Sequence, residues 1–228
     1  MADSRDAGGA RQRHRRPPPG DPAGGRFLYR LQFRKSGPAR FYSHHDLMRL
    51  FERALRRADL PVSLSEGFNQ RPRITFLSAL SLGVESLDER VEIELTEPRP
   101  AEQLRDGLGS QVTEGLVIVG AEAVAARAAA VAAEYEARLP AGATPDPAPL
   151  LALPSVPVER RSAEGVRTVD IRPWIAAITV EDGVLRFTIR ITDSGAARPE
   201  EILKLLGVGG TPLVRTRTVL ADKGGARA

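Results

Sequence analysis

The chain has 228 residues, of which 42% are hydrophobic, which is enough to build the core of one large or two small domains. It contains no cysteine, which excludes disulfides, iron–sulfur ligation and thiol nucleophiles, and with three histidines we expect no structural metal and no bound cofactor. The formal charge is +4, the N-terminus has no apolar signal segment, and no stretch approaches the roughly 18 apolar residues of a membrane span, so we expect a cytoplasmic protein with no membrane contact.

Charge is distributed unevenly along the chain. From Arg30 to Arg73 there are ten Lys or Arg against four Asp or Glu, whereas from Glu85 to Glu136 there are four against twelve. A basic region of this kind suits a polyanionic partner, and an acidic region repels phosphate backbones. Any contact with RNA is therefore expected to use the first region.

The first part of the chain contains the clearest secondary-structure signals. Residues 1–25 are rich in Gly, Pro, Ala and Arg and are predicted to be a disordered basic arm, either a nucleic-acid tether or an unselected tail. Alternating apolar residues predict a strand from Phe27 to Phe33. Ser43 and Asp46 then have the spacing of a helix cap. In the helix that follows, apolar residues form one stripe and the other face carries Arg49, Arg53, Arg56 and Arg57.

The remaining elements give a fold class. A short strand at residues 62–65, a loop at 66–73, strands at 91–95 and 116–119 and a helix at 98–112 complete the order strand, helix, strand, strand, helix, strand, which is that of a ferredoxin-like sandwich. We therefore predict a ferredoxin-like α+β domain at residues 26–124. An Ala-rich helix at 125–133 and a Pro- and Ala-rich linker make up residues 125–157. Residues 158–221 are predicted to form a second, mainly antiparallel α+β half with a coarsely similar order of elements, and residues 222–228 a disordered tail.

Two segments resemble a known family. Arg40–Ala58 reads RFYSHHDLMRLFERALRRA and Leu60–Phe76 reads LPVSLSEGFNQRPRITF, and together they are similar to the radical-SAM-linked family of bacterial proteins of unknown function. The resemblance extends over most of the chain, with two departures: His45 stands where Leu is common and Gln70 where Pro is usual. It implies a separate radical SAM protein of the cobalamin-binding type as partner. The absence of cysteine agrees, because the cluster of such an enzyme needs thiolates.

Two places could carry catalytic chemistry. Ser43, His44 and Asp46 have the side chains of a hydrolytic triad, but adjacent helical residues point about 100° apart, so capping by Ser43 and Asp46 is favoured, with catalysis by His44 as the alternative. Asp170 could be a catalytic acid or nucleophile with Arg172 as its partner. It could equally cap a turn before Pro173, with Trp174 in the core.

Acidic residues on the strand at 91–95 are predicted to be solvated. Glu92 and Glu94 alternate with apolar positions, which is typical of a strand face in water, and no histidine is nearby to favour a metal.

The loop Glu66–Arg73, with sequence EGFNQRPR, has the composition of a site for single-stranded nucleic acid or a phosphate-bearing ligand. Phe68 can stack, Asn69 can read a base edge, and Arg71 and Arg73 can pair with phosphates. The alternative places Phe68 in the core, gives Gly67 a positive φ and leaves the arginines merely solvated. The predicted substrate- or RNA-binding residues are therefore Phe68, Asn69, Arg71 and Arg73 of the loop and Arg49, Arg53 and Arg57 of the helix.

These observations favour an accessory or substrate-binding protein that acts with a radical SAM protein on RNA or on a phosphate-containing substrate. One alternative is a stand-alone RNA-modifying or hydrolytic enzyme that uses His44 or Asp170. The other is a structural partner that docks through the face carrying Glu92 and Glu94.

Overall fold

The computed structural model describes residues 25–162 and 165–222, so the predicted arm, apart from Gly25, and the tail beyond Asp222 lie outside the described residues. The first half contains β1 (Phe27–Lys35), the 3₁₀ helix η1 (Gly37–Phe41), α1 (His44–Arg57), β2 (Ile74–Phe76), β3 (Glu85–Leu95), α2 (Ala101–Gly109) and β4 (Leu116–Ala123). The second half contains β5 (Ala128–Arg138), α3 (Ala148–Ala152), β6 (Pro157–Ser162), β7 (Gly165–Asp170), η2 (Arg172–Trp174), β8 (Ile175–Glu181), β9 (Val184–Arg190), α4 (Pro199–Leu205) and β10 (Val214–Asp222). No helix in this part of the chain is long and apolar enough to cross a membrane.

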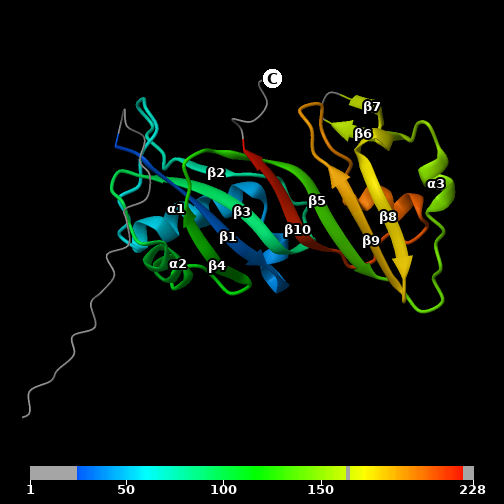
Figure 1. Cartoon of the computed structure of the whole chain (residues 1–228), viewed down its shortest axis with the longest axis horizontal. Coiled ribbons are helices and arrows are strands. Elements are labelled where there is room, and N and C mark those ends of the chain that lie inside the picture. Colours follow the sequence, from blue (N-terminus) through cyan, green and yellow to red (C-terminus); the bar gives the residue numbers. More distant parts are fainter. Residues whose placement is uncertain (1–24, 163–164, 223–228) are drawn as a thin grey trace, which may run out of the picture.

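One eight-stranded sheet runs through both halves along the long axis of the molecule (Figure 1). Its order is β4-β1-β3-β10-β5-β9-β8, and all of its pairs are antiparallel except that of β10 with β3. β3 pairs with β10 through its residues 85–86 and with β2 through its residues 91–93, so the two strands lie along different parts of β3. The prediction of a mixed α+β protein with mainly antiparallel strands is confirmed.

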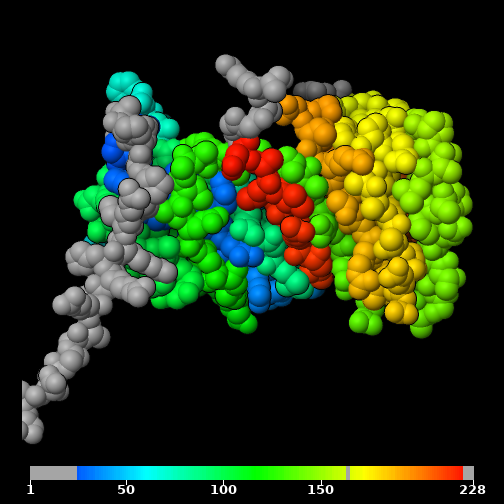
Figure 2. Space-filling view, viewed as in Figure 1, coloured from blue at the N-terminus to red at the C-terminus, as the bar shows by residue number. Residues whose placement is uncertain are grey.

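The two halves have the same strand order. In the first half the order is β4-β1-β3-β2, and in the second it is β10-β5-β9-β8, so that in each half the first and third strands are central. β10 joins the halves, because it pairs with β3 on one side and β5 on the other. Figure 2 shows β10, in red, between the blue and green first half and the yellow and orange second half.

The core consists of two hydrophobic clusters. The first packs α1 and α2 on β1 and β3, with Phe33, Phe51 and Leu104 fully buried, and the second packs α4 on β5, β8 and β9. In the first cluster Phe33 pairs with Glu89 across neighbouring strands, and in the second cluster Phe187 pairs with Tyr135. Glu89 and Tyr135 both accept hydrogen bonds from Arg215, so they lie on the same side of the sheet. Because paired residues project to the same side of a sheet, both clusters lie on one face.

α1 begins as its sequence predicts. Ser43 Oγ accepts a hydrogen bond from Asp46 N at 3.2 Å, and the Asp46 carboxylate accepts one from Ser43 N at 3.0 Å, which completes a capping box. The predicted apolar stripe faces the first cluster, and its buried members are Leu47, Leu50, Phe51, Ala54 and Leu55. The four arginines of α1 are thereby left on the outer face.

The helix predicted at residues 125–133 is wrong, because residues 128–138 form the central strand β5. Alanine favours helices in isolation, but here it pairs on both sides with β10 and β9, and tertiary contacts outweigh the propensity. Ala133 and Ala137 are 1% exposed and lie under the second cluster. The predicted linker also joins this cluster, through the buried side chains of Leu150 and Val156.

Candidate nucleic-acid interface

The strand predicted at residues 62–65 forms only isolated bridges, and the second strand of the sheet is β2 instead. After α1 the chain forms an irregular hairpin over residues 62–73, here named the 62–73 hairpin. Ser65 N donates to Arg71 O at 2.8 Å and Arg73 N donates to Ser63 O at 2.9 Å. The base is fixed to the end of β3, since Ser63 N donates to Glu94 O and Glu94 N donates to Arg73 O. The tip therefore stands out from the body of the molecule, as the cyan loop in Figure 1 shows.

Phe68 lies at the tip of the 62–73 hairpin with its side chain in water. Its relative exposure is 109%, so the alternative that places Phe68 in the core is wrong. Gly67 beside it has φ +106°, a conformation that glycine adopts without strain and that allows the sharp turn. Asn69 is also exposed. An aromatic ring exposed this way, with an amide next to it, can stack on an unpaired base.

The two arginines of the hairpin differ in their availability. Arg73 Nε donates to Leu64 O at 3.2 Å, and its guanidinium lies 3.7 Å from Glu94 Oε2 and 4.0 Å from Glu66 Oε1. Arg71 is exposed, and its guanidinium has no partner among the described residues. Arg71 is thus placed to meet a phosphate, whereas Arg73 holds the base of the hairpin.

The exposed face of α1 carries the arginine ridge, which consists of Arg49, Arg53, Arg56 and Arg57. Arg49 and Arg53 line an open pocket of about 290 Å³ together with Tyr42 and Thr113. Asp59, with φ +50°, turns the chain out of α1, and the hairpin follows directly. The ridge and the hairpin are therefore consecutive parts of one basic segment.

The structure brings no catalytic triad together at His44. The Ser43 hydroxyl donates to the Asp46 carboxylate at 2.6 Å, and these hydrogen bonds lower the pKa of Asp46. The His44 ring is exposed and lies edge-on to Phe76, with 5.3 Å between the ring centroids.

Asp170 has the surroundings that its structural alternative predicts. Asp170 Oδ1 accepts hydrogen bonds from Val156 N at 2.7 Å and Arg172 N at 3.0 Å, and these bonds lower the pKa of the carboxyl. The Arg172 guanidinium donates to backbone carbonyls, including Leu151 O at 2.8 Å. Trp174 is buried in the second cluster. Asp170 thus caps the turn that leads into β8.

The prediction that Glu92 and Glu94 are solvated is wrong. Glu92 is 0% exposed and Glu94 is 8% exposed. Glu92 Oε1 accepts from Arg30 Nη2 and from Ala128 N, both at 2.9 Å, and Arg127 pairs with Glu94. The segment that joins β4 to β5 covers this part of the sheet, so alternation alone could not reveal the burial. A partner therefore finds no exposed carboxylate at these two positions.

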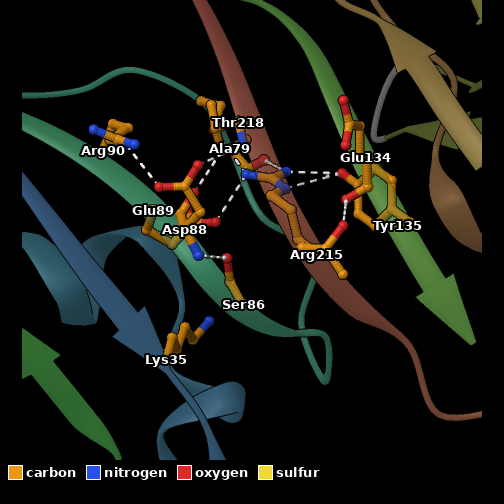
Figure 3. Close-up of polar contacts among 12 residues, drawn as sticks. Lys35, Ala79, Ser86, Asp88, Glu89, Arg90, Glu134, Tyr135, Arg215 and Thr218 are labelled. Carbon is orange, nitrogen blue, oxygen red and sulfur yellow. Dashed lines mark hydrogen bonds and ion pairs between the residues drawn. The ribbon is translucent and has the colours of Figure 1, made fainter. Parts of the chain in front are cut away.

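A buried polar junction, which sequence reasoning missed, separates the two hydrophobic clusters; it consists of Lys35, Glu89, Tyr135 and Arg215. Arg215 is 2% exposed and reaches between Glu89 and Tyr135 (Figure 3). Its Nη1 donates to Glu89 Oε1 at 2.9 Å, and its Nη2 donates to Tyr135 Oη at 2.8 Å. Burial raises the pKa of both the Glu89 carboxyl and the Tyr135 phenol, against the Arg215 charge, which lowers them. The sequence of β10, VRTRTVLAD, contains no signal that Arg215 faces inward while Arg217 is exposed.

Comparison with known proteins assigns a family. A family model described as "Uncharacterized protein conserved in bacteria (DUF2344)" matches residues 28–206, and no curated protein matches the chain. The match includes α1, the 62–73 hairpin and the first three residues of the polar junction. It names no partner, so the radical SAM protein stays a prediction. Because the match spans well over half of the chain, this protein belongs to the DUF2344 family of bacterial proteins.

Proposed function

We propose that this protein binds single-stranded RNA through the 62–73 hairpin and the arginine ridge and acts as an accessory to a separate radical SAM protein. The observation that carries RNA binding is the full exposure of Phe68 at a turn whose backbone is held by hydrogen bonds. The radical SAM partner rests on the sequence resemblance alone.

The proposed surface combines three kinds of contact. The Phe68 ring supplies a stacking platform that accepts any base, and Asn69 supplies a donor and an acceptor for a base edge. Arg71 and the arginine ridge supply exposed positive charge for the phosphates. Because the stacking residue is on the hairpin and most of the charge is on α1, a single strand would bind along both.

We also propose a ferredoxin-like fold for the first half and a related fold for the second. The element order of the first half is strand, helix, strand, strand, helix, strand, with strand order β4-β1-β3-β2. The second half repeats this strand order as β10-β5-β9-β8, with α3 and the β6–β7 hairpin between its first two sheet strands. The repeated order supports an origin of both halves from one unit.

Fluorescence anisotropy with a labelled single-stranded RNA tests the surface. The triple variant Arg49→Ala, Arg53→Ala, Arg57→Ala should bind at least about tenfold more weakly, and the slope of its salt dependence should fall by about 0.7 for each phosphate that the variant no longer neutralises. The matched control is Arg138→Ala, Arg161→Ala, Arg167→Ala, which removes the same charge from exposed positions of the second half. If both variants lose the same RNA affinity, the loss reflects the overall charge of the protein, and this would contradict RNA binding at the hairpin and the arginine ridge.

The partner is tested separately by affinity purification from the native cell, with RNA sequencing and mass spectrometry of the bound material. Recovery of a radical SAM protein together with RNA is the expected result. Recovery of RNA without any radical SAM protein would contradict the accessory role and leave RNA binding intact.

A further inference from the structure

An open pocket of about 400 Å³ lies over the polar junction. It is bounded by residues 78–81, by β5 and β9, and by the loop at residues 192–199. Its walls are partly apolar, with Leu80, Ala133 and Ile189 among them. Among the described residues that line it there are three arginines and no carboxylate, and the arginines are Arg160, Arg198 and Arg215. The volume lies within the usual range for small-molecule sites, roughly 300–1,000 Å³.

Two hydroxyl groups at this pocket have donor hydrogens left to give. Tyr135 Oη accepts from Arg215 Nε at 3.2 Å and from Nη2 at 2.8 Å, and Ser78 Oγ accepts from Nη1 at 2.7 Å. A guanidinium only donates, so neither hydroxyl can direct its own hydrogen to Arg215. Among the described residues, no acceptor for either hydrogen lies within hydrogen-bonding distance. Both oxygens lie within 3.2 Å of one guanidinium, so they are neighbours.

Two of the three arginines at the pocket are paired with carboxylates, and the third is exposed. The Arg215 charge is balanced by Glu89 at 2.9 Å, and the Arg160 charge by Glu201 at 2.8 Å, with neither carboxylate lining the pocket. Arg198 is exposed and lines the pocket, and the carboxylate of Glu200 lies at the pocket edge, where its Oε2 accepts a hydrogen bond from Ser81 Oγ at 3.2 Å. Burial raises the pKa of the Tyr135 phenol, which keeps its hydrogen in place at neutral pH.

We propose that this pocket binds a small organic anion, a carboxylate or a phosphate monoester on an apolar body. An oxygen of the anion accepts hydrogen bonds from the hydroxyls of Tyr135 and Ser78, Arg198 supplies the attracting charge, and the apolar body lies against Leu80 and Ile189. The site is separate from the 62–73 hairpin and does not depend on RNA binding.

Isothermal titration of the full chain with phenyl phosphate and with benzoate tests the proposal, and benzyl alcohol is the uncharged control. At least one anion should bind saturably and the alcohol should not. Tyr135→Phe and Ser78→Ala should each weaken binding about tenfold, because each removes one hydrogen bond to a charged group. The matched control is Tyr29→Phe, which removes a buried phenol hydroxyl bonded to the Arg99 backbone in the first cluster.

Two results would overturn the site: no saturable binding of either anion to the unmodified chain, or equal affinity in Tyr135→Phe and Tyr29→Phe. Thermal melting of each variant shows whether it is folded. If Tyr135→Phe does not fold, Ser78→Ala and Arg198→Ala test the site instead, since neither side chain is buried. Unchanged anion binding in both of these variants would refute the proposal. Phenyl phosphate and benzoate also separate the two kinds of anion, by which of them binds more tightly.

Discussion

The arginine ridge and the polar junction use the same residue type in opposite ways. Arg215 is 2% exposed, and its hydrogen bonds go to Glu89, Tyr135, Ser78 and the carbonyl of Ala79. The arginines of the ridge are exposed on the outer face of α1. A buried and fully paired guanidinium holds structure and has no hydrogen left for a ligand, whereas an exposed one costs little to keep and can bind. Burial and pairing, rather than residue type, separate structural from functional charge here.

The largest expected effect lies in the polar junction. Arg215→Ala should lower the free energy of unfolding by about 3–5 kcal/mol, because it leaves the Glu89 carboxylate buried without its partner. Arg217→Ala is the matched control two residues along β10, where the side chain is 64% exposed and lies 3.6 Å from Glu134. It should cost no more than about 1 kcal/mol. Urea denaturation measures both, and similar reductions in stability would remove the distinction between the two environments.

The next effect lies at the hairpin tip. Phe68→Ala should weaken the free energy of binding to single-stranded RNA by about 1–3 kcal/mol, since one base can no longer stack. The melting temperature of the protein should not change. Phe41→Ala is the control, because Phe41 is also exposed, at 57%, and belongs to η1. Anisotropy titrations and thermal melts check both variants. Equal RNA affinity of Phe68→Ala and the unmodified chain would exclude Phe68 from the binding surface.

A smaller effect tests whether the shape of the tip matters as well as its ring. Gly67→Ala should cost about 1 kcal/mol of stability, since φ +106° disfavours any residue with a Cβ although no atom lies within 4 Å of the added carbon. RNA binding should weaken while Phe68 is still present. Gly109→Ala, at the end of α2 and without a positive φ, should be neutral or stabilising. Thermal melts and anisotropy titrations of both variants measure these effects. If Gly67→Ala has the stability and RNA affinity of the unmodified chain, the turn is not fixed.

The smallest effect concerns pH. The pKa of Asp46 is lowered by its hydrogen bonds to Ser43, so its contribution to stability is present above the ordinary Asp pKa and is lost as the pH falls through the lowered value. Asp46→Asn should therefore melt lower than the unmodified chain at neutral pH, and the difference should shrink in strong acid. Melting curves across the acid range measure this. A difference that grows in acid would contradict the assigned capping role.

The sequence was most informative where neighbouring residues determine the structure. The capping box of α1 and the loop at residues 66–73 depend on residues a few positions apart, and both were predicted. The positive φ of Gly67 was expected only in the alternative that placed Phe68 in the core. β5 was missed because its alanines favour a helix until β9 and β10 pair with them. The burial of Glu92 depends on Arg30, which is distant in sequence, and on the chain that covers β3, and alternation contains no information on either. The inward direction of Arg215 depends on Glu89 and Tyr135 in the same way. Long-range contacts therefore account for these three misses.

Ultraviolet crosslinking of single-stranded RNA to the unmodified chain, followed by mass spectrometry of the crosslinked peptides, tests the proposed RNA-binding surface most directly. We expect crosslinks at Phe68 and its neighbours in the 62–73 hairpin, together with peptides of α1, because a stacked aromatic ring is in direct contact with the base. Crosslinks confined to residues 1–24, or to the second half of the chain, would contradict the assignment of the hairpin and the ridge as the RNA-binding surface.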